Sequence, residues 1–163
     1  MIKDKIKILK STDADTRTAK GEVSKEELLK CTKSHIQDVN NVGNMLMEMF
    51  IEQIKRHDHT KIDNIDEFLN DFNTRYTGYA FKQLPWWQIH KTERHHLNDS
   101  VPDDVNLLDV LEMVIDCTVA GLARKGSVYD ITIPNDVLVR AINNTKDLII
   151  NNTEVIDINT NEV

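Results

Sequence analysis

All six histidines of the chain lie between His35 and His96, and the sequence on either side of this stretch contains none. Imidazole binds borderline divalent metals well, and carboxylates complete the charge balance of such a site. A chain that gathers these side chains around one ion must bring together segments that are distant in sequence. The histidine distribution therefore predicts a metal-binding core in the central part of the chain.

The length of 163 residues suits a single domain with its own core. We expect one domain over residues 1–163, made of an extension (1–22), a helical metal-binding core (23–150) and a tail (151–163). The net charge of −7 argues against duplex nucleic acid as a partner, because a duplex-binding protein needs a basic face.

No apolar run approaches the roughly 20 residues of a membrane span, and the first ten residues lack the apolar block of a secretory signal. We therefore expect no membrane partner and a cytoplasmic location, which is the host cytoplasm if the chain is phage-encoded. A local positive patch at Lys82, Lys91 and Arg94 suits a small anionic ligand.

Local signals predict an all-α fold, a compact bundle of about five helices with minor short β-strands near the termini. Ser24 and Glu27 form a capping box that opens the first helix. The expected helices are 24–55, 65–79, one from Pro85 that carries His90 and Arg94, 105–123 before a Lys125-Gly126 stop, and 134–150. Alternating residues at 2–10 and 154–158 predict two strands that pair as a small ribbon.

The His57-Asp58 doublet is the sharpest metal-binding candidate. His35 lies beside the apolar stripe of the first helix, so we expect it to point inward. Asp116 sits in an otherwise apolar helix, where a buried carboxylate needs a partner or a metal. The alternative is that Asp109, Glu112 and Asp116 form a solvated acidic face.

A second cluster follows two tryptophans and consists of His90, Arg94, His95 and His96. Four such groups within seven residues predict a lined pocket. Trp86, Trp87, Tyr76 and Tyr79 are interpreted as core or pocket wall, His59 as facing solvent, and Cys31 and Cys117 as buried thiols.

The arrangement H…HD…D resembles the HD-domain superfamily of metal-dependent phosphohydrolases, which are all-helical. The resemblance covers roughly residues 30–150 and implies His35, His57, Asp58 and Asp116 as ligands of a first ion. It also implies that His90, with His95 or His96, holds a second ion and that Asp58 bridges the two. In HD-x-x-K, here His57 to Lys61, the resemblance implies that the lysine faces the phosphate.

More narrowly, the HDHTK, ERHH and EMVID boxes are similar to a small family of phage and bacterial proteins. The Gly-Tyr-Pro signature of the cyclic-dinucleotide branch is missing, which argues against cyclic-di-GMP as a substrate.

The resemblance implies hydrolysis of a small phosphorylated molecule, such as a nucleotide, with one or two divalent ions (Mn, Fe, Co, Ni, Zn or Mg). The implied catalytic residues are Asp58, Lys61, Glu112 and Arg94. Lys61 and Arg94 would neutralise phosphoryl charge, and Glu112 would accept a proton or orient a histidine. We also expect that the chain forms a homo-oligomer.

Three alternatives stay open. One is a non-catalytic metal- or nucleotide-binding regulatory protein on an HD scaffold. Another is a di-iron or three-histidine helical bundle, a class that uses Glu-x-x-His motifs on paired helices. The third is a structural interaction protein, which would leave the histidine clustering without a cause.

Overall fold

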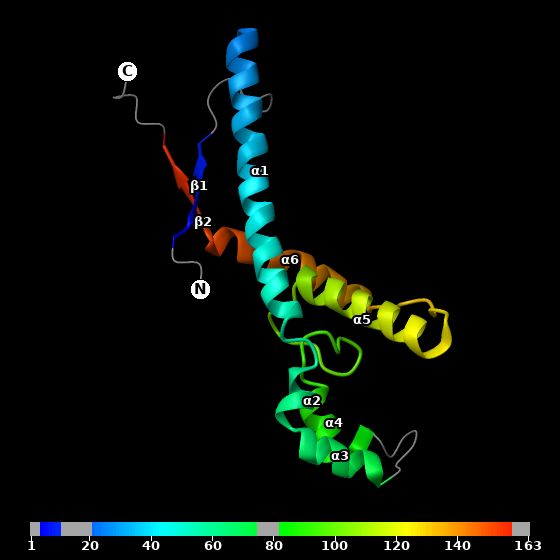
Figure 1. Ribbon diagram of the computed structural model, residues 1–163. Coiled ribbons are helices and arrows are strands. Elements are labelled where there is room, and N and C mark those ends of the chain that lie inside the picture. The colour runs from blue at the N-terminus through cyan, green and yellow to red at the C-terminus, as the bar shows by residue number, and fades with distance from the viewer. Residues whose placement is uncertain (1–3, 11–20, 75–81, 158–163) are drawn as a thin grey trace. The chain divides into compact units, whose positions relative to one another are not determined.

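A computed structural model describes residues 4–10, 21–74 and 82–157, and the chain divides into two compact units. The first unit comprises residues 1–49 and 146–163, and the second comprises residues 50–145. Helices dominate both units, as Figure 1 shows, and the predicted fold class, helical with two short strands near the termini, is confirmed. Within the described ranges, no helix is both long and apolar enough to cross a membrane.

The first helix, α1 (Lys25–Ile54), begins where the capping box predicts. The Ser24 hydroxyl accepts a hydrogen bond from the Glu27 amide at 3.2 Å, and the Glu27 carboxylate accepts one from the Ser24 amide at 3.0 Å. The predicted inward stripe is wrong for the first half of α1. His35 is exposed, and the side chains of Ile36 and Val39 are 53% and 56% exposed. Helical periodicity indicates a face, but burial also requires an element to cover that face.

The two strands, β1 (Ile6–Leu9) and β2 (Thr153–Ile156), form a parallel two-stranded sheet in which Ile6 pairs with Thr153. Both strands are shorter than predicted, but the predicted pairing of the two terminal segments is confirmed. This ribbon lies in the first unit, whereas the doublet and the second histidine cluster lie in the second unit.

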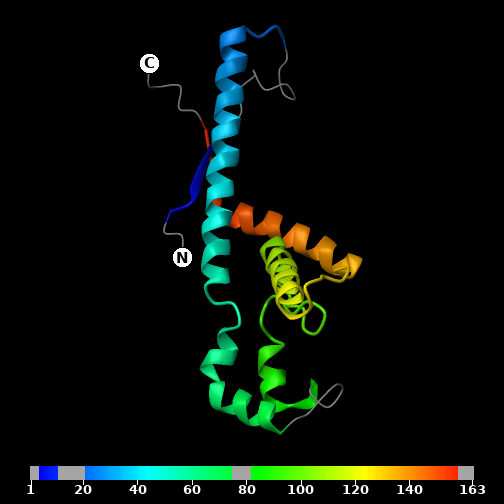
Figure 2. The same ribbon diagram turned by 45° about the vertical axis from the view of Figure 1, so that its right-hand side comes forward.

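Three short helices of the second unit contact one another: α2 (His59–Asp63), α3 (Ile65–Asn73) and α4 (Pro85–His90). They lie together in both views (Figures 1 and 2). Pro85 opens α4 as predicted, because its missing N–H and fixed φ suit the first helical turn. Helix α3 ends well before Tyr79, and the predicted continuation, with Tyr76 and Tyr79, lies outside the described residues.

The prediction that Arg94 continues the helix of His90 is wrong. Helix α4 ends at His90, and the chain then follows a series of turns. In these turns the Glu93 amide donates to the His90 carbonyl at 3.0 Å, and the His96 amide donates to the Glu93 carbonyl at 3.0 Å. These hydrogen bonds join residues three apart, so the chain turns more tightly than in an α-helix. The turns bring His90, His95 and His96 to one side of the segment.

The last two helices, α5 (Leu107–Lys125) and α6 (Asn135–Asn151), agree closely with prediction. An Asn106–Asp109 capping box opens α5, and Gly126 ends it with a φ of 68°, a left-handed conformation that glycine adopts without a steric penalty. The hydrophobic core gathers between these helices and the turn segment. Its buried members are Leu97, Val105, Met113, Val137 and Ala141.

Candidate metal centre

The His57-Asp58 doublet lies in the turn between α1 and α2. Asp58 has a φ of 58°, the left-handed conformation that few non-glycine residues adopt. The backbone is held there by a hydrogen bond from the Asp58 amide to Glu93 Oε2 at 2.8 Å. Such backbone strain costs roughly 1–3 kcal/mol and is found preferentially at functional sites. The turn directs the Asp58 carboxylate towards the histidines of the second cluster.

The first ligand group consists of Asp58, His90, His95 and His96, whose ligand atoms all lie within 4.8 Å of one another. Asp58 Oδ1 is 3.4 Å from His90 Nε2 and 3.7 Å from His95 Nε2. The Nε2 atoms of His90 and His96 are 2.9 Å apart. Two nitrogens bound to one ion at about 2.0–2.1 Å lie roughly 3 Å apart, so these spacings match a shared cation.

The second ligand group consists of His57, His95 and Asp116. His57 Nε2 lies 3.5 Å from Asp116 Oδ1 and 3.8 Å from Asp58 Oδ2. Asp58 therefore presents one oxygen to each group. The structure brings both members of the doublet, Asp116 and three histidines of the second cluster into one place.

Two buried carboxylates, Glu93 and Glu112, stand behind the histidines, and we call them the outer carboxylates. Glu112 Oε1 is 2.9 Å from His57 Nδ1 and 3.3 Å from His95 Nδ1. A carboxylate at Nδ1 favours the ring form that carries its proton there and leaves the lone pair of Nε2 for a metal. The outer carboxylates thus turn the Nε2 atoms inward.

His95 provides the test of whether a cation fits. Its side chain is 2% exposed, and neither ring nitrogen makes a hydrogen bond within the described ranges. Nδ1 lies 3.3 Å from Glu112 Oε1, whereas Nε2 lies 3.7 Å from Asp58 Oδ1 and faces the centre. A buried polar atom without a partner costs roughly 1–3 kcal/mol, so its presence calls for an explanation. A cation beside Asp58 satisfies this nitrogen. The buried histidine and carboxylate group could hold a metal ion.

The pKa shifts of these groups follow from their neighbours. Burial by itself raises the pKa of both outer carboxylates, but the donors around them hold both pKa values below the usual range. His90 and Thr60 lower the pKa of Glu93, and His95, His57 and Gln53 lower the pKa of Glu112. Burial also opposes protonation of His95, yet the nearby acids raise its pKa. Burial is the main cause that lowers the pKa of His96 to about 4, the neighbouring imidazoles of His95 and His90 lower it further, and Asp116 and Asp58 oppose this shift only in part.

Asp109 and Arg94 form a buried ion pair next to the site. Asp109 is fully buried, and its carboxylate accepts from Arg94 Nε at 2.7 Å and from Arg94 Nη2 at 2.8 Å. Glu112 is only 3% exposed, so the interpretation of these acids as a solvated face is wrong. Arg94 also donates to Asp104, which leaves its guanidinium committed to carboxylates.

Lys61 and His59 lie at the partly exposed edge of the doublet. Lys61 Nζ donates to Asp58 Oδ2, and both side chains are 29% exposed. His59, predicted to face solvent, is 37% exposed at its side chain, and its Nδ1 lies 3.6 Å from Glu93 Oε1. The accessible side of the site therefore carries a lysine.

Aromatic rings wall the second cluster. Trp86 is 3% exposed and stacks on the His90 ring, with 4.9 Å between the ring centroids. The Phe68 ring in turn stacks on Trp86, with 4.1 Å between their centroids. Trp87 is partly exposed and meets the His96 ring edge-on at 5.4 Å. The interpretation of both tryptophans as core or pocket wall agrees with these contacts.

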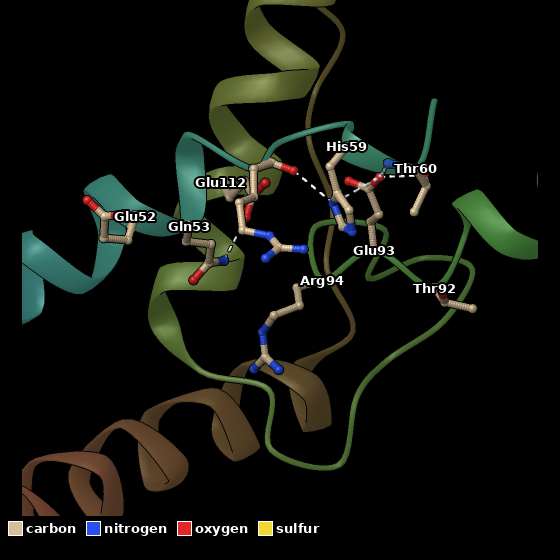
Figure 3. Close-up of a pocket in the computed structure, with 9 residues that line it drawn as sticks. Glu52, Gln53, His59, Thr60, Thr92, Glu93, Arg94 and Glu112 are labelled. Atoms are coloured by element: carbon tan, nitrogen blue, oxygen red, sulfur yellow. Dashed lines mark hydrogen bonds and ion pairs between the residues drawn. The ribbon is translucent and has the colours of Figure 1, made fainter. Parts of the chain in front are cut away.

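A cavity of about 530 Å³ adjoins the outer carboxylates. In Figure 3, Glu52 and Gln53 project from α1 on one side, and Glu93 and Thr60 lie on the other. None of the six side chains in the two ligand groups lines this cavity. The cavity therefore lies behind the histidines, against the carboxylates that orient them.

His35 is the one predicted ligand that the structure does not bring to either group. It lies on the part of α1 that belongs to the first unit, and its role as a ligand stays a prediction. Cys31 and Cys117, predicted to be buried, are both only partly buried.

Sequence reasoning missed Glu93, Thr60 and Gln53. Gln53 donates to Asp109 at 2.9 Å and to Glu112 at 2.6 Å, and so links the buried ion pair to the site. The only available signal was the position of Glu93 within ERHH, at Glu-x-x-His spacing from His96. These two residues lie outside any helix, whereas a di-iron bundle would carry that motif on a helix.

Comparison of the chain with protein-family models, with curated proteins and with solved structures found no match.

Proposed function

We propose that this chain is a metal-dependent phosphohydrolase of the HD type. It acts on a small phosphorylated substrate, in the first place a nucleotide. The observation that carries the proposal is the position of Asp58, which offers one carboxylate oxygen to His90 and His95 and the other to His57. A carboxylate flanked in this way would hold one or two divalent ions together with these histidines.

His95 decides how the two groups divide. Its Nδ1 faces Glu112, so only Nε2 is directed to the centre, and one nitrogen binds one ion. We assign His90, His95 and His96 with Asp58 to one ion. His57 and Asp116, with the second oxygen of Asp58, form the smaller position, which corresponds to the ion of the H…HD…D pattern. The proposed metal is a divalent transition ion, because imidazole ligands outnumber carboxylates.

A bound divalent ion supplies Lewis-acid chemistry, by which it polarises a phosphoryl oxygen and lowers the pKa of water. The chain's own residues would do the rest. Lys61, whose ammonium donates to Asp58 Oδ2 on the accessible side, would neutralise charge on the phosphoryl oxygens. Glu112 is buried and committed to two histidines and Gln53, so we assign it an orienting role in place of proton transfer. Arg94 is likewise assigned to holding Asp109.

Trp87 supports a nucleotide as the substrate class. It is partly exposed and adjoins His96, so a base could stack on it while the phosphate reaches the metal ligands. The substitution Trp87→Leu should then raise KM for nucleotides and leave hydrolysis of a small aryl phosphate unchanged.

The deciding experiment measures metal content and phosphate release on the same variants. His57→Ala and Asp58→Ala should lose bound metal by elemental analysis and lose release of phosphate from nucleotides with Mn²⁺, Co²⁺ or Ni²⁺, while helical circular dichroism persists. His59→Ala serves as the matched control from the same turn. His35→Ala tests the remaining ligand of the family pattern. Full metal stoichiometry in His57→Ala and Asp58→Ala would remove the basis of the proposal.

One observation favours a second candidate, a regulatory protein that binds metal and a small ligand without turnover. The 530 Å³ cavity is separate from the metal-facing nitrogens, so a ligand held there would not meet the ion. Saturable nucleotide binding by calorimetry, with no phosphate release under any of the three metals, would select this candidate.

A further inference from the structure

The Thr60 hydroxyl contacts both Glu93 and His90, and His90 Nδ1 also lies 3.5 Å from Glu93 Oε1 itself. The hydroxyl oxygen donates to Glu93 Oε1 and is 2.8 Å from His90 Nδ1. A hydroxyl has one hydrogen, so it donates to one of these neighbours and accepts from the other. Which neighbour receives the hydrogen decides where His90 carries its own proton.

The surroundings of Glu93 settle that choice. Glu93 Oε1 accepts from the Thr60 amide at 2.8 Å, and Oε2 accepts from the Asp58 amide at 2.8 Å. Backbone amides only donate, so both carboxylate oxygens act as acceptors. The Thr60 hydrogen therefore points to Glu93, and the Thr60 oxygen is left to accept from His90 Nδ1–H.

A neutral imidazole that is protonated at Nδ1 has its lone pair at Nε2. In His90, which is 2% exposed, Nε2 is the atom that lies 3.4 Å from Asp58 Oδ1 and 2.9 Å from His96 Nε2. The same carboxylate that sets this tautomer also holds the Asp58 amide. One buried group thus fixes both a histidine and the carboxylate opposite it.

We propose that Glu93, acting through the Thr60 hydroxyl, fixes His90 in the tautomer that binds a cation through Nε2. By accepting from the Asp58 amide, Glu93 also holds the Asp58 turn so that its carboxylate faces His90 Nε2. Glu93 is a positioning residue, because it contacts the ligands and not the ion. The effect on metal affinity rests on the proposed metal centre, whereas the tautomer of His90 is a property of the metal-free chain.

The test compares four variants with the wild type. Glu93→Gln places an amide NH₂ where Oε1 or Oε2 accepts, and Thr60→Val removes the hydroxyl at nearly constant volume. Thr60→Ser restores the hydroxyl and is the rescue variant. Glu52→Gln changes an exposed carboxylate on the same cavity and is the matched control.

The first readout is the nitrogen-15 signal of His90 in the metal-free protein, which distinguishes a protonated nitrogen from a bare one. We expect protonated Nδ1 in the wild type, Thr60→Ser and Glu52→Gln, and transfer of the proton towards Nε2 in Thr60→Val and Glu93→Gln. The second readout is the affinity for Co²⁺ alone. It should fall by about 10- to 100-fold in Thr60→Val and Glu93→Gln only.

The two readouts separate the two ideas. Wild-type signals and Co²⁺ affinity in Thr60→Val would overturn the proposed action of Glu93 through the Thr60 hydroxyl, since His90 Nδ1 keeps its direct 3.5 Å approach to Glu93 Oε1 in that variant. The phosphohydrolase proposal would stay intact. The expected tautomer change in a protein that binds no Co²⁺ would support the role of Glu93 in setting His90 and would refute the metal centre. If Glu93→Gln does not fold, Thr60→Val and Thr60→Ser still decide the question.

Discussion

Asp109 offers the sharpest test of how the buried part of the site is built. The substitution Asp109→Ala removes a fully buried carboxylate that accepts hydrogen bonds from Gln53, from Arg94 twice and from the Asn106 amide. Removal of one partner from a buried ion pair costs about 3–5 kcal/mol, because the other charge stays behind unpaired.

The expected value lies at the low end of that range. Arg94 is 36% exposed at its side chain and keeps Asp104 as a second partner, so water and that carboxylate relieve part of the loss. We expect the free energy of unfolding to fall by about 3 kcal/mol, measured by urea denaturation of the metal-free protein.

Asp104→Ala is the matched control, because Asp104 binds the same guanidinium at 3.0 Å but is 76% exposed. An exposed pair contributes about 0–1 kcal/mol, so this control should be nearly silent. A loss below about 1 kcal/mol for Asp109→Ala would mean that Asp109 is solvated, and the buried pair would then be an incorrect description.

Three further predictions concern metal orientation, pH and a helix end. Glu112→Gln should weaken Co²⁺ binding about 10- to 100-fold, read by competition with a chelating dye, because the amide no longer holds both His57 and His95 in one ring orientation. The pKa of His96 is lowered from 6.5 to about 4, so the unfolded chain binds a proton in that window that the folded chain does not. Stability of the metal-free protein should therefore fall as pH drops from 6.5 to 4. The loss should stay well below the roughly 3 kcal/mol of the full shift, because His96 is only partly buried and solvent screens it, and because the raised pKa of His95 acts in the opposite direction. Equal pH slopes for His96→Asn and the wild type in urea titrations would contradict this. Gly126→Ala should cost about 1 kcal/mol by thermal unfolding, because alanine is strained at a φ of 68°, and an unchanged melting temperature would argue against that helix end.

The helix limits were predictable because short-range signals set them. The Ser24–Glu27 capping box, Pro85 and Gly126 each act within one turn of the chain, and each marks an observed helix end. The exception is the segment after His90, where helical spacing predicted a longer helix. There the turns are held by contacts with Asp58 and Thr60, which lie about 30 residues earlier in the sequence.

The candidate site divides in the same way. The sequence indicated the doublet, the second cluster and Asp116, because histidines and acids at these spacings are unusual wherever they fall. It did not indicate Glu93, since one glutamate in a charged segment looks like any surface residue. Its importance comes from burial, because a buried carboxylate is unstable unless it accepts hydrogen bonds from neighbouring donors.

From its residue order alone, this chain determined where the long helices lie, where most of them begin and end, and which side chains are able to bind a cation. Only the tertiary structure decided which carboxylates are buried and which nitrogen of each histidine faces the centre. The reason is the range of the forces. Capping and periodicity depend on neighbours along the chain, whereas burial and ring orientation depend on which distant segment packs against each side chain.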